Sequence, residues 1–309
     1  MKKRWKEYFE KLLNEEYPKE VLESMSWNEG LIGLVGEEEV RDAVKAMKKK
    51  KAVGPDGVPV EVWKMLGDVS IGWLKNLLNK ILIEGKMPED WRKSFIVPIF
   101  KGKGNIQECG NYRGIKLMSH SMKIWEKIIE KRIRSETSIS GNQFGFMPGK
   151  STMEPLFCVR QLVEKYREKN KKLCMVFIDL EKAYDRVPRE VLRWALMRKN
   201  VPKMYVNLIQ DMYEGSSTSV KSRCGISEGF SIGVGVHQGS ALSPYLFSVV
   251  MDEVSKEIQG DIPWCMMFAD DIVLIGENLE VVNNRLNEWR LALEEKGLRI
   301  SRNKTEYIE

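Results

Sequence analysis

Apolar residues in the first 90 positions recur every three to four residues among charged ones, which is the spacing of amphipathic helices. The pattern predicts four helices, over residues 5–13, 37–51, 60–66 and 71–83. The second ends in the lysine run 48–51, which fits a solvated helix end and, alternatively, contacts to phosphate. This part of the chain is therefore predicted to be helical.

The pattern changes after residue 93, where short β-prone runs alternate with helical stripes. Two strands are predicted at 94–100 and 112–117, and a basic turn at 101–104 follows the first of them. Two later helices are predicted at 121–135 and 153–169. A glycine-rich turn at 141–152 precedes the last helix, and Ser151 or Thr152 is predicted to cap it.

Two apolar segments of strand length end in aspartate. Residues 173–178 are continuously apolar and stop at Asp179, which places a carboxylate at the tip of a buried strand. Further along, 264–268 and 272–275 flank Ala269-Asp270-Asp271, which predicts a tight hairpin with an acidic turn.

Three such carboxylates close together would require cations. Two carboxylates about 5 Å apart repel by about 3 kcal/mol at an effective dielectric constant near 20. Mg²⁺ takes hard oxygen ligands, and two ions about 3.5 to 4 Å apart can clamp the attacking and leaving oxygens of phosphoryl transfer. The structural alternative is a solvated turn at 270–271 and an Asp179 that caps the following segment. Apolar strands beside each acid favour the metal site.

A glycine-rich bend at 229–244 lies between these acids in the sequence. Gln238 and Gly239 stand in it, before a predicted helix with Ser243 at its N-cap and Pro244 in its first turn. Glycine lets a backbone approach a ligand closely, and Gln238 can hydrogen-bond a nucleotide; a turn before a capped helix is the structural alternative.

Composition adds limits rather than a function. The 309 residues are 43% hydrophobic and 30% charged, which is typical of a globular chain with a sizeable core. No apolar run approaches the roughly 20 residues of a membrane-spanning helix, and the charged start lacks the apolar core of a signal peptide. We therefore expect an intracellular protein, in the cytoplasm, the nucleus or both, without membrane association.

The cysteine pattern and the net charge limit the possible metal sites, disulfides and binding partners. Five scattered cysteines and two histidines, with no C-x-x-C pair, argue against a structural zinc or disulfide framework. The formal charge of +6 fits a polyanionic partner, although many enzymes share such an excess.

A nucleotide-hydrolase P-loop is excluded by spacing. Gly149-Lys150-Ser151 matches the end of G-x-x-x-x-G-K-[ST], but the first glycine would have to stand at Phe144. Gly145 leaves three intervening residues instead of four, and no clear strand feeds the loop.

The order of these blocks resembles reverse transcriptases. The resemblance rests on Phe177-Ile178-Asp179 to Tyr184-Asp185, then Gln238-Gly239 to Ser243-Pro244, then Phe268-Ala269-Asp270-Asp271. Upstream blocks resemble the LINE-type, non-LTR retrotransposon enzymes; these are Gly54-Pro55-Asp56-Gly57, Pro98-Ile99 with Lys101, Tyr112-Arg113, and Gln143-Phe144-Gly145-Phe146 to Ser151-Thr152. The match covers nearly the whole chain.

The resemblance implies an α+β right-hand polymerase fold with helical fingers and an antiparallel-sheet palm. It implies an N-terminal helical extension and start of the fingers at 1–90, fingers at 91–170, and a palm with the catalytic aspartates at 171–309. It also implies an RNA template, a DNA primer and deoxynucleoside triphosphates (dNTPs) as partners, with two Mg²⁺ ions that Mn²⁺ can replace. The oligomeric state is not indicated.

Residue roles follow from the same resemblance. Asp179 and Asp270 would hold the metal ions, with Asp271 beside them and the carbonyl of Leu180 as a further ligand. Lys304, in Asn303-Lys304-Thr305, matches a palm lysine that can protonate pyrophosphate, with an exposed surface lysine as the alternative.

Four positions match nucleotide-binding residues of the family. Lys101 and Arg113 match fingers residues that hold the triphosphate, and whether Lys101 or Lys103 does so stays open. Tyr184 matches the steric gate that excludes a ribose 2′-hydroxyl, where many relatives have phenylalanine. Gln238, followed by Gly239, matches the position that lies against the nucleotide.

Two departures from the family pattern bear on activity. Gly114 stands where relatives usually have proline, and the sequence ends five residues after Lys304, where a thumb subdomain would normally follow. We therefore expect a thumbless fragment of a larger polyprotein or a truncated genomic relic.

Three functions are compatible with these patterns. The leading one is an RNA-directed DNA polymerase, a nucleotidyltransferase in which a primer 3′-hydroxyl attacks a dNTP. The alternative is a non-catalytic nucleic-acid-binding remnant of such an enzyme. An RNA-templated RNA polymerase shares the acidic site but is disfavoured by Tyr184.

Overall fold

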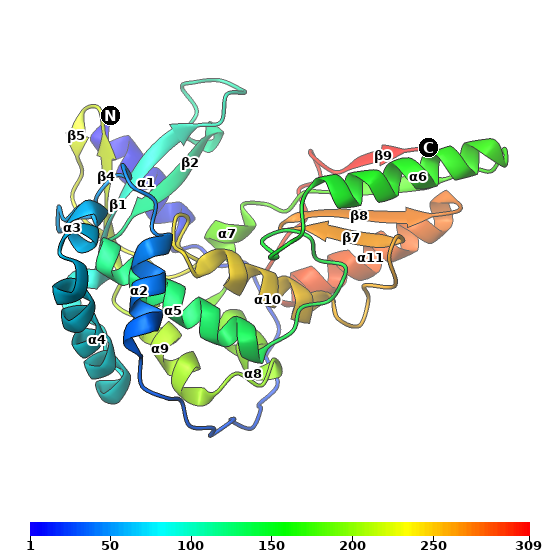
Figure 1. The fold of residues 1–309 in the computed structure, drawn as a ribbon. Coiled ribbons are helices and arrows are strands. Elements are labelled where there is room, and N and C mark those ends of the chain that lie inside the picture. Colours follow the sequence, from blue (N-terminus) through cyan, green and yellow to red (C-terminus); the bar gives the residue numbers. More distant parts are fainter. The chain divides into compact units, whose positions relative to one another are not determined.

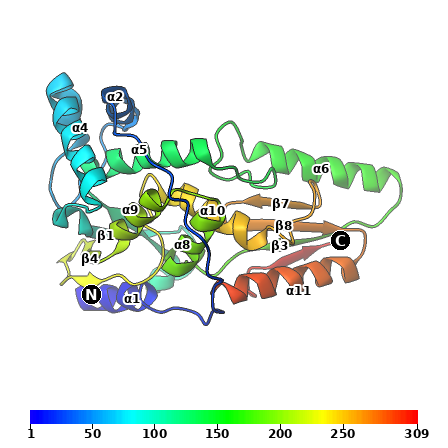
Figure 2. The same ribbon diagram turned by 90° about the horizontal axis from the view of Figure 1, so that it is seen from below.

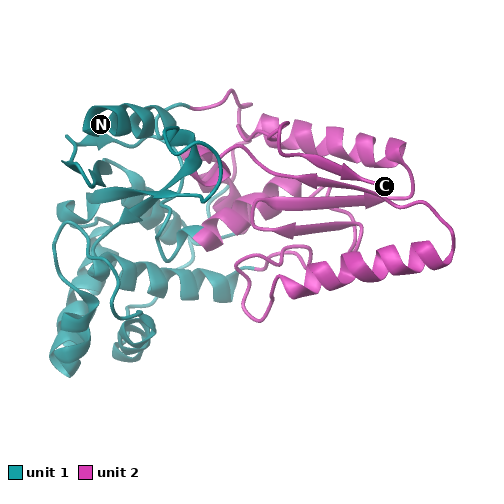
Figure 3. Cartoon of the chain, turned by 90° about the horizontal axis from the view of Figure 1, so that it is seen from above, with its two compact units in different colours: residues 1–15, 26–137, 200–243 teal, residues 16–25, 138–199, 244–309 magenta.

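The chain of the computed structural model, described over residues 1–309, divides into two units (Figure 3). Unit 1 comprises Met1–Glu15, Ser26–Thr137 and Asn200–Ser243, and unit 2 comprises Glu16–Met25, Ser138–Lys199 and Pro244–Glu309. The units interleave along the chain, whereas the sequence divided it into consecutive ranges at 90 and 170. The physical reason is strand pairing between distant segments, which brings residues 200–243 into unit 1.

Unit 1 is built on a mixed five-stranded sheet. Its strands are β1 (Lys93–Phe100), β2 (Tyr112–Leu117), β4 (Ser217–Ser222), β5 (Gly225–Ile226) and β6 (Phe230–Ser231). The order is β2-β1-β4-β5, with β6 also on β4, and β1 pairs antiparallel with β2 but parallel with β4. The apolar face of α1 (Lys2–Leu12) packs into this unit, where Phe9 meets Ile96 and Val220 in one buried cluster.

Five further α-helices belong to unit 1 (Figure 1), and all but the last of them match predicted amphipathic stripes. They are α2 (Glu37–Ala46), α3 (Val60–Met65), α4 (Gly67–Glu84), α5 (His120–Glu136) and α9 (Lys203–Tyr213), with two short 3-10 helices at Glu89–Arg92 and Cys109–Asn111. The inner face of α5 is buried, including Trp125 and Ile129.

Unit 2 is a four-stranded sheet in which all pairs are antiparallel, as predicted for this part of the chain. The order is β7 (Cys265–Phe268), β8 (Asp271–Gly276), β3 (Cys174–Ile178) and β9 (Glu306–Ile308). Its helices are α6 (Met153–Glu168), α7 (Ala183–Arg186), α8 (Arg189–Arg198), α10 (Ser243–Ser255, whose first residue lies in unit 1) and α11 (Leu279–Glu295).

Helices cover the strands of unit 2 on both sides (Figure 2). Side chains of α6 pack against one face, where Met175, Val273 and Ile275 are buried. Helix α11 lies on the other side and contacts β3 and β8. Because the central strands are buried on both faces, their sequences are continuously apolar rather than alternating.

The predicted helices and strands are present, with three corrections. Helix α2 ends at Ala46 rather than continuing through the lysines, because the backbone turns to extended geometry at Met47. Ser240, not Ser243, supplies the capping oxygen before α10, since its Oγ accepts the N–H groups of Leu242 and Ser243. The side chain of Thr152 makes no capping hydrogen bond.

The structure also contains elements that the sequence did not predict. Helix α9 and strands β4 to β6 lie between 203 and 231, helix α7 follows shortly after Asp179, and β9 spans Glu306–Ile308. None of the helices is both long enough and apolar enough to cross a membrane.

Gly114, a departure from the expected family pattern, has a packing explanation. It pairs with Pro98 across β1 and β2. A Cβ at this position would lie 2.5 Å from Cε1 of Phe9 and 3.1 Å from Cγ2 of Ile96. Helix α1 therefore packs on β2 through the space that the missing side chain leaves.

Gly114→Ala is therefore expected to lower the free energy of unfolding by about 1–3 kcal/mol, the typical cost of overpacking a filled core. Urea denaturation measures it. Gly110→Ala is the matched control, because a Cβ there meets no atom within 4 Å. Combining Gly114→Ala with Phe9→Leu should recover part of the loss; an unchanged midpoint in Gly114→Ala would contradict the packing explanation.

Candidate active site

The three aspartates lie at one end of the unit 2 sheet. Asp179 directly follows β3, Asp270 stands in the turn between β7 and β8, and Asp271 begins β8. Strands β3 and β8 are antiparallel with Ile178 opposite Ile272, so the end of β3 and the start of β8 coincide. The predicted acidic hairpin and the acid-tipped strand are thus brought together by strand register.

A buried glutamine hydrogen-bonds to the backbone of the acidic turn. Gln143 is fully buried, and its Oε1 accepts hydrogen bonds from the N–H of Ala269 at 3.0 Å and of Gly145 at 2.8 Å. The adjacent backbone is tied to β7, because Phe144 N–H donates to the Met267 carbonyl and Met267 N–H to the Asn142 carbonyl. Gln143 therefore links the glycine-rich segment to the residue that precedes Asp270.

Gly145 allows this close approach. A Cβ at Gly145 would lie 2.3 Å from the backbone nitrogen of Ala269, a distance that real atoms do not adopt. Ala269 itself has a positive φ of 60°, a left-handed conformation that costs energy for a residue with a side chain. The two contacts from Gln143 and Gly145 compensate for that local strain. The sequence showed these residues only as part of a family block, without this role.

Lys304 is close to the aspartates. Its Nζ donates to Oδ2 of Asp179 at 2.8 Å, and both side chains are partly exposed. Lys304 is thus exposed, as the alternative expected, and it also pairs with an aspartate of the acidic cluster. The residues after Asp179 continue as a bridge of Leu180 to Ile300, in which the hydrogen bonds use Asp179 O and Glu181 N, so the carbonyl of Leu180 takes no part in them.

The repulsion among the aspartates appears in the proton affinity of Asp271. Partial burial raises the pKa of Asp271, the carboxylates of Asp270 and Asp179 raise it further, and Lys304 lowers it. No group of three or more His, Cys, Asp or Glu side chains is arranged to close around a single ion. Such a cage is not what Mg²⁺ requires, because it is commonly held by one or two carboxylates together with substrate phosphates.

Tyr184 lies in an aromatic stack beside this cluster. Its ring stacks on Phe247 with centroids 4.4 Å apart and meets Phe146 edge-on at 6.1 Å. Burial raises the pKa of the Tyr184 phenol, and the carboxylate of Asp270 raises it further. Its hydroxyl is buried without a hydrogen-bond partner. The position of the ring is thus set by packing and not by its hydroxyl.

A groove of about 460 Å³ opens beside the aspartates. Asp179, Asp271 and Lys304 contribute its polar wall, and the rest is mostly apolar residues of α6 and the strands, including Leu156, Phe177 and Phe268. The carboxylates of Asp179 and Asp271 therefore face a groove.

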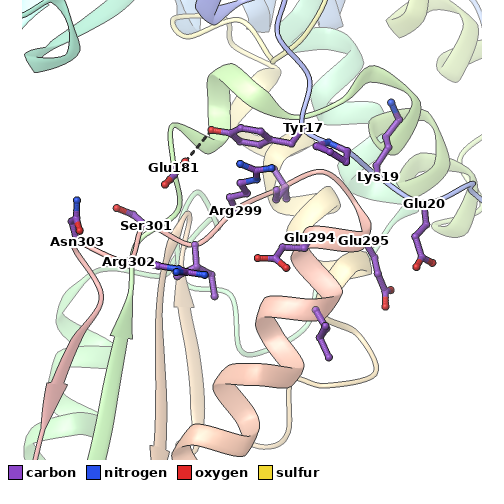
Figure 4. Close-up of a pocket in the computed structure, with 14 residues that line it drawn as sticks. Tyr17, Lys19, Glu20, Glu181, Glu294, Glu295, Arg299, Ser301, Arg302 and Asn303 are labelled. Atoms are coloured by element: carbon purple, nitrogen blue, oxygen red, sulfur yellow. Dashed lines mark hydrogen bonds between the residues drawn. The ribbon is translucent and has the colours of Figure 1, made fainter.

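A larger groove, of about 800 Å³, contains none of the three aspartates (Figure 4). Tyr17 lies in it with its hydroxyl 2.9 Å from Glu181 and with the guanidinium of Arg299 4.0 Å from its ring centroid. The lining mixes carboxylates with cations, namely Glu20, Glu181, Glu294, Glu295, Lys19, Arg299 and Arg302. This groove lies beside the segment that follows Asp179, and its mixture of charges does not favour binding of a phosphate backbone.

The residues predicted to bind the triphosphate lie in unit 1. Lys101 begins the basic turn, and its Nζ is held at 3.0 Å by the carbonyl of Gly110. Lys103, at the exposed tip of the turn, has no such tether. Arg113 is exposed on β2 opposite Ile99. Lys101 is thus held to the backbone of the turn, whereas Lys103 extends from its exposed tip.

Gln238 and Gly239 also lie in unit 1. The carbonyl of Gln238 accepts the N–H of Lys116 at 2.7 Å, which ties the bend to β2. Gly239 has a φ of 108°, and a Cβ there would lie 2.8 Å from the carbonyl oxygen of Lys116. Only glycine fits here, because the bend packs closely against the backbone of β2.

The site residues therefore form two groups. Unit 2 contains the residues predicted for the metal site, the gate and proton transfer, namely Asp179, Leu180, Tyr184, Asp270, Asp271 and Lys304. Unit 1 holds the nucleotide-binding candidates Lys101, Arg113, Gln238 and Gly239.

Comparisons with known proteins agree with this architecture. The family model for reverse transcriptase (RNA-dependent DNA polymerase) matches residues 99–309. The retrovirus-related Pol polyprotein from type-1 retrotransposable element R2 of Nasonia vitripennis is 28% identical over 83% of this chain and 26% of that protein. The probable RNA-directed DNA polymerase from transposon BS of Drosophila melanogaster is 30% identical over 69% of this chain and 24% of its own length. The chain thus spans about a quarter of the length of these relatives.

Solved structures support the fold. The structure of apo telomerase from Candida tropicalis matches with a TM-score of 0.53 at 14% identity, over 81% of this chain and 50% of that one. This likeness concerns the fold alone, and it confirms the α+β right-hand polymerase architecture. The relatives likewise confirm the predicted resemblance to non-LTR retrotransposon enzymes. This chain belongs to the reverse transcriptase family.

Proposed function

We propose that this chain carries the polymerising centre of an RNA-directed DNA polymerase, which extends a DNA primer on an RNA template with dNTPs. The observation that carries the proposal is the convergence of Asp179, Asp270 and Asp271 at one end of a rigid, buried sheet. In this proposal the antiparallel sheet of unit 2 is the palm, and the basic turn of unit 1 belongs to the fingers.

The family implies a divalent metal, and the donor set fits one. Asp179, Asp270 and Asp271 offer hard carboxylate oxygens, and the carbonyl of Leu180 adds another. When bound, two Mg²⁺ or Mn²⁺ ions would activate the primer 3′-hydroxyl and neutralise charge on the transferred phosphate. The raised pKa of Asp271 supports the same conclusion, because the cluster lacks sufficient positive charge of its own.

Lys304 supplies part of that positive charge. Its ammonium lies 2.8 Å from Asp179, so it carries a proton at the edge of the site where pyrophosphate would leave. The proposed role as proton donor to pyrophosphate requires that the amine lie at the site, and this geometry supports it.

Tyr184 acts in the proposal as the gate against ribonucleotides. Its ring is wedged by Phe247 and Phe146, and a ring held in this way cannot withdraw from a 2′-hydroxyl. Discrimination by a built-in clash is a common route to specificity. On unit 1, Arg113 with Lys101 or Lys103 would bind the triphosphate.

The alternative is a nucleic-acid-binding remnant without catalysis. It keeps the fold and the net charge of +6 but makes no use of the clustered acids. The two functions differ in primer extension.

Primer extension by the 309-residue chain tests the proposal, with an RNA template, a DNA primer, dNTPs and Mg²⁺. Asp270→Asn should lower kcat by about 10³-fold, because losing several kcal/mol of metal-mediated stabilisation corresponds to that factor at 1.36 kcal/mol per tenfold. Asp261→Asn, at the other end of the hairpin, is the matched control and should extend normally. If the parent binds template-primer at low salt but never extends it, the binding remnant replaces the polymerase.

Tyr184→Phe and Tyr184→Ala separate ring bulk from the hydroxyl. The phenylalanine variant should keep the parental preference for dNTPs, because the hydroxyl makes no hydrogen bond. The alanine variant should incorporate ribonucleotides at least about tenfold more readily relative to dNTPs. Single-nucleotide insertion kinetics measure both, with thermal unfolding as a check on folding. Equal discrimination in all three proteins would remove Tyr184 from the gate role.

Asp271→Asn should stabilise the metal-free protein. Since the folded pKa of Asp271 is raised, its ionisation disfavours the folded state as pH rises through that pKa, and asparagine removes this effect. In urea denaturation with EDTA at pH 7, the gain should be under about 1 kcal/mol, because solvent screens the exposed carboxylate. It should vanish below about pH 4, where folded and unfolded states are both protonated. A gain that persists at low pH, or that Asp261→Asn reproduces, would contradict the repulsion.

A further inference from the structure

Unit 1 contains a buried acid that the proposed chemistry does not use. Glu126 lies on the inner face of α5 and is 2% exposed. Burial raises the pKa of its carboxyl group, against the lowering effect of two hydrogen bonds and of Lys123 and Lys116. A carboxylate in such a place is costly, and replacing buried ionic groups by apolar ones is often neutral or stabilising. Its presence therefore requires an account of what its two oxygens hold.

Both oxygens of Glu126 bind one loop. The hydroxyl of Ser240 donates to Oε1 at 2.6 Å, and the backbone N–H of Ala241 donates to Oε2 at 2.9 Å. These residues belong to loop 238–241, which consists of Gln238, Gly239, Ser240 and Ala241. The carboxylate thus forms a two-point clamp between α5 and the loop.

Ser240 extends the clamp into the backbone. Its Oγ, while donating to Glu126, accepts the N–H groups of Leu242 and Ser243, each at 3.1 Å. The direction of the first bond is thereby fixed, because both acceptor positions of the hydroxyl are occupied. A carboxylate can accept hydrogen bonds from both the Ser240 hydroxyl and the Ala241 N–H, because both of its oxygens are acceptors. A carboxamide has only one acceptor oxygen, so its NH₂ group would point at one of these two donors.

The other side of the loop is fixed by β2. Lys116 N–H donates to the Gln238 carbonyl, and the Lys116 carbonyl oxygen lies within 2.8 Å of where a Cβ of residue 239 would be. Loop 238–241 is therefore held between β2 and the Glu126 carboxylate, while Gln238 stays partly exposed and Gly239 exposed. Gln238 and Gly239 therefore stay accessible to a ligand, while the backbone of the loop is held in place on both sides.

We propose that Glu126 is the positioning residue that fixes loop 238–241, and through it Gln238, for contact with the incoming nucleotide. The inference rests on the proposed polymerase function. Glu126 touches no substrate; it acts through Ser240 and Ala241, and its effect is on nucleotide affinity and not on the metal site.

Steady-state extension kinetics on an RNA template with varied dNTP test this role in the 309-residue chain. Glu126→Gln leaves either the Ser240 hydroxyl or the Ala241 N–H without an acceptor, and Ser240→Ala removes the hydroxyl that donates to Glu126. Each should raise the KM for dNTP by about tenfold with a much smaller change in kcat and none in the KM for template-primer. The double variant should cost less than the product of the two, because both act through one contact.

Glu130→Gln is the matched control, since Glu130 lies one turn further along α5 and pairs with Arg134 at 2.6 Å. It should behave as the parent. Hydrogen exchange of the peptide covering 236–244 should accelerate in Glu126→Gln and Ser240→Ala alone. If Glu126→Gln does not fold, Ser240→Ala decides the question from the loop side.

The outcomes separate the two claims. A parent that never extends primer overturns the proposed function, and this inference with it. An active parent in which Ser240→Ala and Glu126→Gln leave the KM for dNTP unchanged, or lower kcat alone as a loss of folded enzyme would, overturns the positioning role of Glu126 only.

Discussion

Electrostatic repulsion among three carboxylates is the constraint on which the rest of unit 2 depends. Asp179, Asp270 and Asp271 would move apart on a flexible scaffold, since like charges a few ångströms from one another repel by kilocalories even near a surface. They are held instead at the ends of strands that are buried on both faces, with Val176 and Leu274 fully enclosed. The apolar core thus holds the strand ends in place, and Lys304 provides part of the counter-charge.

The turn that carries two of these acids depends on backbone contacts from a distant segment. Gln143 and Gly145 are far from Ala269 in sequence, but one accepts its N–H and the other leaves room for it. A similar arrangement recurs in unit 1, where Glu126 and Gly239 fix the bend around Gln238. In both places a buried polar side chain holds a loop while a glycine lets two backbones meet. Buried polar groups of this kind are costly when unpaired, and this cost makes the loop geometry specific.

Family membership and the geometry of the site answer different questions. The matches to retrotransposon polymerases assign the chain to its family and fold, but they do not state how a given side chain acts. The structure supplies this locally: Tyr184 is positioned by aromatic packing, Lys304 by its ion pair with Asp179, and Lys101 by the carbonyl of Gly110. Each assignment concerns contacts within one unit.

The sequence by itself determined most helices and strands, the acidic hairpin and the identity of the three aspartates. These depend on local periodicity and on apolar runs that end in acid, which are visible without a fold. It did not determine α9 or the short strands β4 to β6, because Ser217–Ser222 is largely polar and acquires its strand conformation from pairing with β1. Nor did it show the roles of Gln143, Glu126 or Gly114. Their partners, Ala269, Ser240 and Phe9, are more than 100 positions away, and only the tertiary structure brings such residues into contact.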